Sequence, residues 1–338
     1  MSIPPLTDKV LKKKWRLGAL VGTGACADVY EVTDVSGGTM AESGKLVAKI
    51  APLAVDLPSQ PKQRFLEKKR NADLVYWEDQ LYRGYLRPLR DRSSVVEIPR
   101  YGYGEDQGVR FLVMTRLGPD ITAAKRESEP WSVARTAGYA QQMLQILRVL
   151  HEECRMVFVD VKPENFLFGR PDSADKDNIF LVDFGLSSRF AEISGSIKPQ
   201  TRGGVQGTPE YLSLRCHGGW NAGRCDDLES LGYVIVSMLK KGSSELPWSG
   251  STSIEHGLDM KRSTTLESLC QGCPAGMLKY MRAVRGMAYD QAPDYKKLDA
   301  MLKSMARGKR ERSARVTAAG ASDEPPVKVR RSARLSSK

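Results

Sequence analysis

The sequence lacks the marks of a secreted or membrane protein. Its six cysteines follow no disulfide framework, and the stretch from Met1 to Trp15 contains no apolar core, so we expect free thiols and no secretory signal. The most apolar helical stretch, Leu231–Leu239, is far shorter than the about 20 residues that a membrane helix needs. We therefore expect a soluble protein of a reducing compartment, with no membrane association.

Metal and redox chemistry also have little support. Cys270 and Cys273 form one C-x-x-C pair, and no second pair follows at zinc spacing, which favours free thiols. The 338 residues are 41% hydrophobic and 27% charged, the balance of an ordinary globular protein. A chain of this size can bury a core that needs neither disulfides nor a structural metal.

The net charge of +12 is spread unevenly. Residues 307–338 contain ten Lys or Arg and three acidic residues, a net charge of +7, and few large apolar side chains. We predict that this tail is disordered, because it cannot bury enough surface to offset the entropy of ordering. Its basic runs suit nuclear targeting, non-specific contact with DNA, or a solvated tail. Nuclear localisation is thus favoured over cytoplasmic.

Periodicity divides the chain into a strand-rich part and a helical part. The predicted elements are two strands around a glycine turn in 15–33, a strand over 45–50, a helix over 65–85, a hairpin over 95–118, and helices over 132–152 and 228–239. The predicted units are an N-terminal extension (1–14), a small lobe (15–118), a larger helical lobe (119–306) and the tail (307–338). The fold class is α+β.

The glycine turn is suited to a nucleotide. Gly22, Gly24 and Val29 fit a G-x-G-x-x-G-x-V loop, in which small residues let the backbone cover the phosphates, although Ala27 replaces the third glycine. Taken alone, this pattern fits a plain hairpin turn equally well.

Lys49 lies downstream of this turn, on a predicted strand, where a lysine can reach the α- and β-phosphates of ATP. A carboxylate on the next helix would hold it there. Glu78 and Glu67 are the candidates, and Glu78 is preferred because it lies among apolar residues that face inward.

The strongest local signal is the D-x-K-P-E-N stretch that begins at Asp160. In this motif Asp160 would accept the proton of a substrate hydroxyl, Lys162 would steady the γ-phosphate, and Asn165 would bind a magnesium ion. Asp183 comes downstream of this motif, in a D-F-G sequence after a buried strand, and would bind the other magnesium.

These four signals occur in one order and on suitable elements, and together they resemble the protein kinase family over about residues 15–305. The resemblance implies a two-lobed fold, with a small antiparallel sheet and one main helix before a larger helical lobe. It also implies ATP and Mg²⁺ as cofactors, and transfer of the γ-phosphoryl group to protein Ser or Thr hydroxyls.

Further motifs resemble one branch of this family. The stretch from Gly207 to Gly219 has no Ala-Pro-Glu, and together with Asp226–Tyr233 it resembles the casein kinase I group. The segments I-P-R-Y-G-Y-G from Ile98 and N-I-F-L-V-D-F-G from Asn178, with the basic tail, are most similar to the vaccinia-related kinases.

That resemblance assigns several roles. Asp227 would brace the catalytic loop, Met114 would stand behind the adenine, and Thr208 would lie near Asp160 and Lys162. The backbone of Thr115 and Leu117 would hydrogen-bond the adenine edge. The full set of nucleotide contacts is then Gly22, Gly24, Val29, Ala48, Lys49, Met114, Thr115, Leu117 and Asp183.

One departure bears on regulation. The usual His-Arg before the catalytic Asp is Phe158-Val159 here, so no arginine is present to grip a phosphorylated activation loop. We expect activity that is independent of activation-loop phosphorylation, on protein substrates that are acidic or chromatin-associated. The alternatives are a pseudokinase scaffold, and a chromatin- or nucleic-acid-binding regulator that uses the tail.

Overall fold

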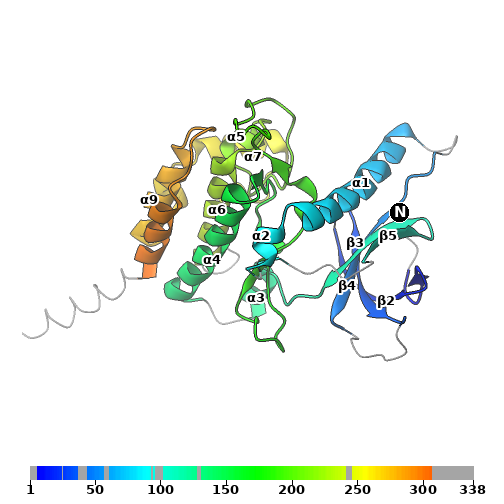
Figure 1. Ribbon diagram of the computed structural model, residues 1–338. Helices are drawn as coiled ribbons and strands as arrows, with labels where there is room; N and C mark the ends of the chain where they lie inside the picture. The colour runs from blue at the N-terminus through cyan, green and yellow to red at the C-terminus, as the bar shows by residue number, and fades with distance from the viewer. Residues whose placement is uncertain are drawn as a thin grey trace, which may run out of the picture.

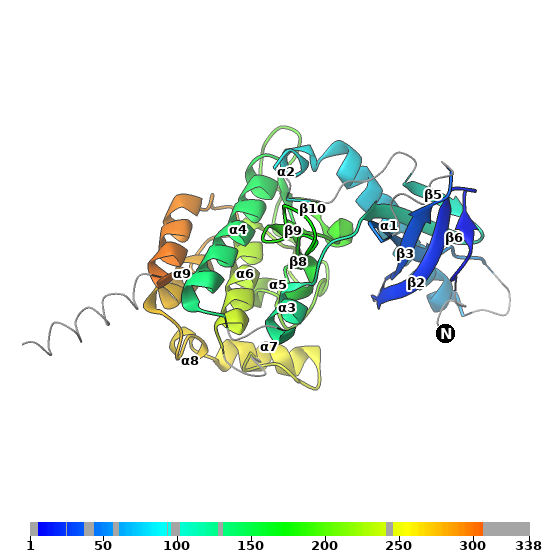
Figure 2. The ribbon, with the colours of Figure 1, turned by 90° about the horizontal axis from the view of Figure 1, so that it is seen from below.

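The structure is a computed structural model in which two lobes lie side by side (Figures 1 and 2). It describes residues 6–24, 26–36, 44–56, 61–92, 94–95, 102–127, 131–240 and 246–306. The predicted basic tail and residues 98–101 of the I-P-R-Y-G-Y-G motif lie outside this part of the chain. A sheet forms most of the small lobe and helices form the large one, as the sequence predicted.

The small lobe is built on a six-stranded antiparallel sheet in the order β1-β2-β3-β4-β6-β5. Its strands are β1 (Val10–Leu11), β2 (Trp15–Thr23), β3 (Asp28–Asp34), β4 (Leu46–Pro52), β5 (Tyr103–Asp106) and β6 (Val109–Thr115). The sequence had placed the lobe boundary at residue 15. β1 pairs with β2, and Leu6 and Leu11 are buried in the same core, so the lobe already includes these earlier residues.

The two faces of the sheet bury different sets of side chains, because successive residues of a strand point to opposite sides. One face forms a separate core that includes Trp15, Tyr30 and Phe111. The other face packs on α1 (Lys62–Gly84), which contacts β4 and β6. Along β4, alternate side chains therefore face the lobe junction, and those between them face the separate core.

The large lobe is helical. Its helices are α3 (Ile121–Glu127), α4 (Val133–Glu152), α5 (Leu214–His217), α6 (Arg224–Leu239), α7 (Ile254–Ser263), α8 (Leu266–Leu269) and α9 (Ala275–Arg285), and residues 295–306 are helical too. Nearly every residue of α6 is buried, since α4 and α9 pack on it. The short α2 (Arg87–Arg90) follows α1 and contacts α4.

Short strands and 3₁₀ turns flank the loops of the large lobe that face the small lobe. They are β7 (Met156–Val157), β8 (Phe166–Phe168), β9 (Ile179–Leu181), β10 (Ser188–Arg189) and the 3₁₀ turns η1 (Pro163–Asn165) and η2 (Phe184–Leu186). β8 pairs with β9, and β7 pairs with β10. This pairing brings 158–165 and 183–187, which are distant in sequence, to the same end of the large lobe.

A short segment joins the two lobes. Gly118 donates its N–H to the carbonyl of Phe168 at 2.8 Å, and Phe168 donates to the carbonyl of Pro119 at 3.0 Å. A Cβ on Gly118 would meet the carbonyl oxygen of Gly169 at 2.5 Å, so the approach of the two chains requires glycine. No helix in the described residues is both long and apolar enough to span a bilayer.

Candidate active site

Asp160 lies at the centre of a cluster of hydrogen bonds after β7. One carboxylate oxygen accepts hydrogen bonds from the backbone N–H and the hydroxyl of Thr208, both at 2.8 Å. The other oxygen lies 2.8 Å from the ammonium of Lys162, which also donates to the Thr208 hydroxyl at 3.2 Å. The structure thus brings together three residues that the sequence assigned to one site.

Asn165 closes the loop that Asp160 begins. Its side-chain nitrogen donates to the backbone carbonyl of Asp160 at 2.9 Å, and only 4% of the residue is exposed. The η1 turn makes this contact possible, since it reverses the chain between the two residues. Because the amide nitrogen is used within the loop, the amide oxygen is the end that can coordinate a cation.

Lys49 joins the small lobe to the D-F-G stretch. Its ammonium lies 2.8 Å from the carboxylate of Glu78 on α1 and 2.6 Å from that of Asp183. Glu78 is fully buried and also accepts the N–H of Phe184 at 3.1 Å. Glu67, the rival candidate, is exposed on an outer turn of α1, so the preference for Glu78 agrees with the geometry.

Lys49, Glu78 and Asp183 lie close enough to shift one another's pKa values. Desolvation lowers the pKa of Lys49, but the charges of Asp183 and Glu78 outweigh it and raise that pKa. Burial raises the pKa of Glu78. For Asp183, burial also acts to raise the pKa, but the charge and hydrogen bond of Lys49 hold it below its usual range. The lysine is thus held as a cation beside an ionised Asp183.

Phe184 anchors the backbone next to Asp183 because its ring packs in the core. Asp183 has φ +66°, in the left-handed region, and Phe184 is fully buried behind it. The Phe184 ring makes edge-to-face contacts with Tyr82 on α1 at 5.5 Å and with Phe158 at 5.3 Å. Phe158, which replaces the usual histidine of the motif, therefore extends an apolar column that runs from Tyr82 of α1 through Phe184.

A buried carboxylate braces the catalytic loop from α6. Asp227 accepts the backbone N–H of Phe158 at 2.6 Å and that of Val159 at 2.9 Å. It also contacts His151 of α4 at 2.9 Å, and His151 contacts the Tyr295 hydroxyl at 2.7 Å. The sequence predicted the role of Asp227. It gave no sign of His151 or Tyr295, which are both distant from Asp227 along the chain.

The glycine-rich turn connects β2 to β3. Gly22 and Gly24 are exposed, and Gly24 donates its N–H to the carbonyl of Ala27 at 2.9 Å. A Cβ on Gly22 would meet nothing within 4 Å, so open space adjoins the backbone there. Ala27, in place of the third glycine, is buried, and Val29 is partly buried against the main core.

The structure contradicts one predicted nucleotide contact. Ala48 is fully buried in the core on the opposite face of the sheet from the cleft. Alternation along β4 puts Val47 on the same face as Lys49, and Val47 is paired with Met114 of β6. Both Val47 and Met114 belong to the main core, so Val47 is the residue that the sequence should have named.

The segment after Met114 leads from β6 to the large lobe. Thr115 is paired with Leu46 at the end of β6, and the N–H of Arg116 donates to the carbonyl of Lys45 at 2.8 Å. Leu117 is partly buried against the main core, just before Gly118 crosses to the large lobe. Thr115 is thus the last residue of β6, and Leu117 lies in the segment that leads from this strand to the large lobe.

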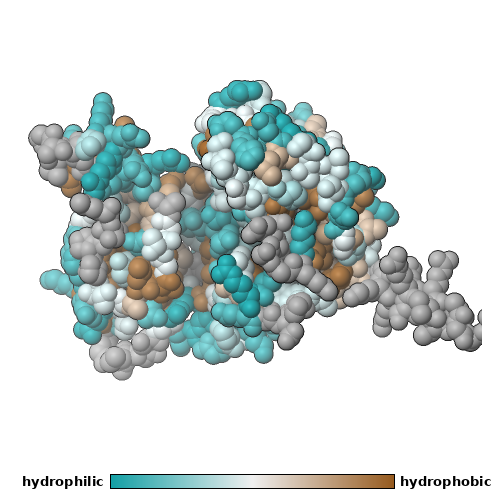
Figure 3. All heavy atoms as spheres, turned by 180° about the vertical axis from the view of Figure 1, so that it is seen from behind, coloured by the Kyte–Doolittle hydropathy of each residue, from teal (hydrophilic) through white to brown (hydrophobic). Residues whose placement is uncertain are grey.

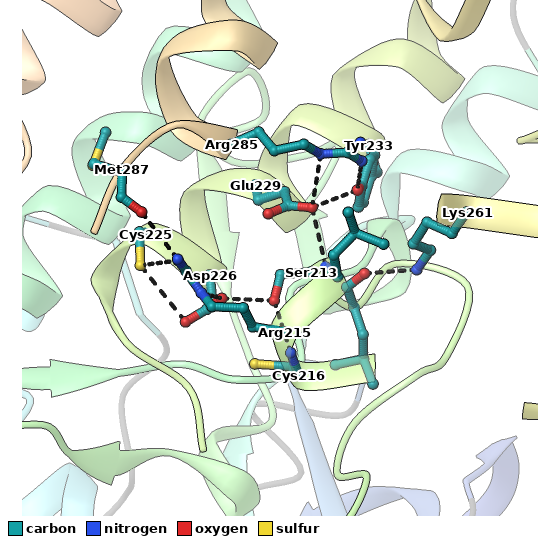
Figure 4. A network of polar contacts seen from close by, with 12 residues as sticks. Ser213, Arg215, Cys216, Cys225, Asp226, Glu229, Tyr233, Lys261, Arg285 and Met287 are labelled. Atoms are coloured by element: carbon teal, nitrogen blue, oxygen red, sulfur yellow. Dashed lines mark hydrogen bonds and ion pairs between the residues drawn. The ribbon is translucent and has the colours of Figure 1, made fainter. Parts of the chain in front are cut away.

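A second polar network lies beneath the stretch 207–219 (Figure 4). Buried Glu229 of α6 accepts the N–H of Leu214 at 3.1 Å and the Tyr233 hydroxyl at 2.6 Å, and it is ion-paired with Arg285 at 3.4 Å. Fully buried Lys261 donates to the carbonyls of Pro209 at 2.9 Å and Leu212 at 2.6 Å. Sequence reasoning found none of these anchors, because each joins residues far apart along the chain.

The donors present fit a phosphorylated nucleotide with a hard cation. Asp183, with 46% of its side chain exposed, and the amide oxygen of Asn165 are the kind of oxygen ligands that Mg²⁺ takes together with phosphate oxygens. In the described residues no group of three or more His, Cys, Asp or Glu could hold a metal by itself. The site is therefore suited to a cation that arrives with phosphates.

Comparison with known proteins gives a consistent result. The sequence model of the Protein kinase domain family matches residues 86–321. Casein kinase I homolog 2 of Schizosaccharomyces pombe is 33% identical over 216 residues, covering 61% of this chain and 49% of that protein. Casein kinase I homolog 1 of Saccharomyces cerevisiae is 31% identical over 305 residues, covering 86% and 50%. The chain spans about half the length of these curated relatives.

Proposed function

The chain belongs to the protein kinase domain family, and from this we propose that it is an ATP-dependent Ser/Thr protein kinase. It would transfer the γ-phosphoryl group of Mg-ATP to Ser or Thr hydroxyls of protein substrates. The convergence of Asp160, Lys162 and Thr208 opposite the Lys49–Asp183 pair carries this proposal. Similarity to casein kinase I homologues supports it. A pseudokinase scaffold is not favoured, because Lys49, Asp160 and Asp183 are all present.

Asp160 and its neighbours act on the acceptor side. The Asp160 carboxylate orients the substrate hydroxyl and accepts its proton as the oxygen attacks. Lys162, 2.8 Å from Asp160, neutralises charge on the transferred group. Thr208 holds both side chains in place through its hydroxyl, and this arrangement supports Ser/Thr acceptors by the family resemblance.

Lys49, Asn165 and Asp183 act on the nucleotide side. Lys49 orients the α- and β-phosphates, and Glu78 prevents it from turning away. Asn165 and Asp183 would hold the magnesium ions. When bound, Mg-ATP supplies the phosphoryl group, and its metal ions neutralise the charge on the phosphates. The backbone of Thr115 and Leu117 would hold the adenine, between Val29 and Val47 above and Met114 behind.

We also propose that the kinase works without activation-loop phosphorylation. Val159 stands where an arginine would bind the phosphate, and it packs against a small core of Val157, Phe190 and Ala191. The β7–β10 pairing and the guanidinium of Arg224 stacked on Phe190 at 4.7 Å hold the same segment. Apolar contacts thus take the place that an ion pair with a phosphate holds in kinases with the arginine.

The finer assignments rest on the sequence. We propose that the chain is a member of the vaccinia-related kinase subfamily, works in the nucleus, and phosphorylates acidic or chromatin-associated proteins. The net charge of +12 supports a preference for acidic targets and non-specific DNA contact through the tail.

Phosphate transfer from radiolabelled ATP to casein and histone tests the proposal. We expect transfer that requires Mg²⁺, stops on chelation, resumes when Mg²⁺ is restored, and yields only phosphoserine and phosphothreonine. Bound ATP without any transfer would contradict the enzyme and favour the scaffold. Phosphotyrosine as the main product would contradict the Ser/Thr assignment.

A further inference from the structure

The first turns of α1 stand clear of the molecule. From Lys62 to Arg70 every side chain is exposed or half-buried, and burial begins only at Ala72. This end of the helix projects from the small lobe at the upper right of Figure 1, and at the upper left of Figure 3 it forms a hydrophilic arm. At about 1.5 Å per residue, the arm extends for about 13 Å.

This arm carries a strong positive charge. It contains five basic residues and one acidic residue, Glu67, a net charge of +4. The basic residues are Lys62, Arg64, Lys68, Lys69 and Arg70. Within the described part of the chain, none of the five forms an ion pair.

The arm is also poorly stabilised as a helix. Its first turn has no acidic residue and its N-cap, Pro61, makes no side-chain hydrogen bond. Lys and Arg at this end oppose the helix dipole, and the like charges of Arg64 and Lys68 repel one another at i, i+4. An anionic partner would remove each of these unfavourable terms.

The cations surround the helix. At about 100° per residue they fall on the helical wheel so that no arc wider than about 120° lacks one. An extended acidic peptide touches one side of a helix, and would leave half of these charges unused. A partner with negative charge on two opposing walls would engage them all.

We propose that this arm of α1 binds double-stranded DNA by inserting into the major groove. An α-helix with its side chains is about 10–12 Å wide, and the major groove of B-form DNA is about 12 Å wide with phosphates along both walls. The deep, narrow major groove of A-form RNA does not admit a helix. This function is separate from phosphoryl transfer, and it adds a DNA-binding element within the folded domain.

Fluorescence anisotropy on a labelled 20-base-pair DNA duplex tests this proposal with the full chain. The test variant is Lys62→Gln/Arg64→Gln/Lys68→Gln/Lys69→Gln. The matched control is Lys9→Gln/Lys13→Gln/Lys296→Gln/Lys297→Gln, which removes the same charge from exposed sites elsewhere. Because each phosphate contact contributes about 0.9 to the slope of log K against log salt, the test variant should lose about 2–4 from that slope. Its affinity at about 0.1 M salt should fall about 10-fold or more.

For the control variant, the slope of log K against log salt should stay within about 0.9 of the wild-type slope, which is the contribution of one phosphate contact. Thermal unfolding checks the fold, and the test variant should unfold no earlier than wild type, since it loses like-charge repulsion. Equal losses in the two variants would overturn the proposal. If binding of an A-form RNA duplex depended on the arm as strongly as binding of DNA does, the fit to the major groove would be overturned. If polyglutamate displaced the labelled duplex at concentrations at which unlabelled DNA duplex does not, the partner would be an acidic protein instead.

Discussion

Asp227 accepts the backbone N–H of Val159 at 2.9 Å, and Val159 has φ +77°. A β-branched residue in the left-handed region costs about 1–3 kcal/mol, and it persists only where the surroundings hold it. The carboxylate supplies that restraint one residue before Asp160. The position of the catalytic loop therefore depends on a buried carboxylate of α6.

Asp227→Ala should destabilise the protein by about 3–5 kcal/mol, since it leaves two buried N–H groups and His151 without their acceptor. Urea unfolding followed by circular dichroism measures this change. The exposed Asp290→Ala variant is the control and should change stability by less than about 0.5 kcal/mol. A similar small change in Asp227→Ala would show that the loop is held by other contacts.

Glu78→Gln should lower kcat/KM for phosphate transfer about 100-fold or more, because Lys49 loses one of its two carboxylate partners. Steady-state kinetics with Mg-ATP and casein provide the measurement. Glu67→Gln removes the same charge from the exposed arm of the same helix and should leave kcat/KM unchanged. If both variants retained full activity, Glu78 would have no role in positioning Lys49.

The sequence was informative wherever the signal is local. Asp160, Lys162 and Asn165 belong to one short motif, and their fixed spacing predicted a cluster that the structure contains. Glu78 was preferred over Glu67 from its apolar neighbours, and burial of Glu78 agrees. In both cases the chain itself dictates which side chains meet.

Elsewhere the deciding information was not local. Assigning Ala48 instead of Val47 to the cleft was an error of one position, which in a strand reverses the face. β1 is very short and has no periodic pattern, so its burial depends on pairing with β2. The contacts of Lys261 with Pro209 and Leu212 join residues that are distant along the chain, and no motif marks them.

Activity should survive the loss of phosphate from the activation segment. The activation segment runs from the D-F-G stretch to Gly207, and its exposed hydroxyls are Ser188, Ser194, Ser196 and Thr201. Their combined substitution by Ala, or treatment with a phosphatase, should leave kcat/KM within about two-fold of wild type, because Val159, and not an arginine that could bind a phosphate, stands immediately before Asp160. Mass spectrometry confirms the dephosphorylated state. Loss of activity on dephosphorylation would contradict the proposed apolar stabilisation by Val159.

Lys261 should make stability depend on pH. Desolvation lowers the pKa of this buried lysine to about 7, whereas the unfolded lysine titrates near about 10.4. Between these values the unfolded chain binds more protons, so the free energy of unfolding rises as the pH increases. Below about pH 7 both states are protonated and the dependence disappears.

Urea unfolding at pH 7 and pH 9 measures this effect. The stability of wild type relative to Lys261→Met should rise by roughly 2 kcal/mol over this interval. The same comparison with the exposed Lys296→Met should show no such rise. A constant difference between wild type and Lys261→Met would show that the lysine stays charged when buried.

Transfer of radiolabelled phosphate by Asp160→Asn, measured beside its affinity for ATP, tests the central claim most directly. Asn keeps the shape of Asp and can still accept the two hydrogen bonds from Thr208, but it cannot take a proton from the acceptor hydroxyl. The account predicts that transfer falls about 10²–10⁴-fold while ATP binds as in wild type. Unchanged transfer would contradict the assignment of Asp160 and, with it, the proposed mechanism.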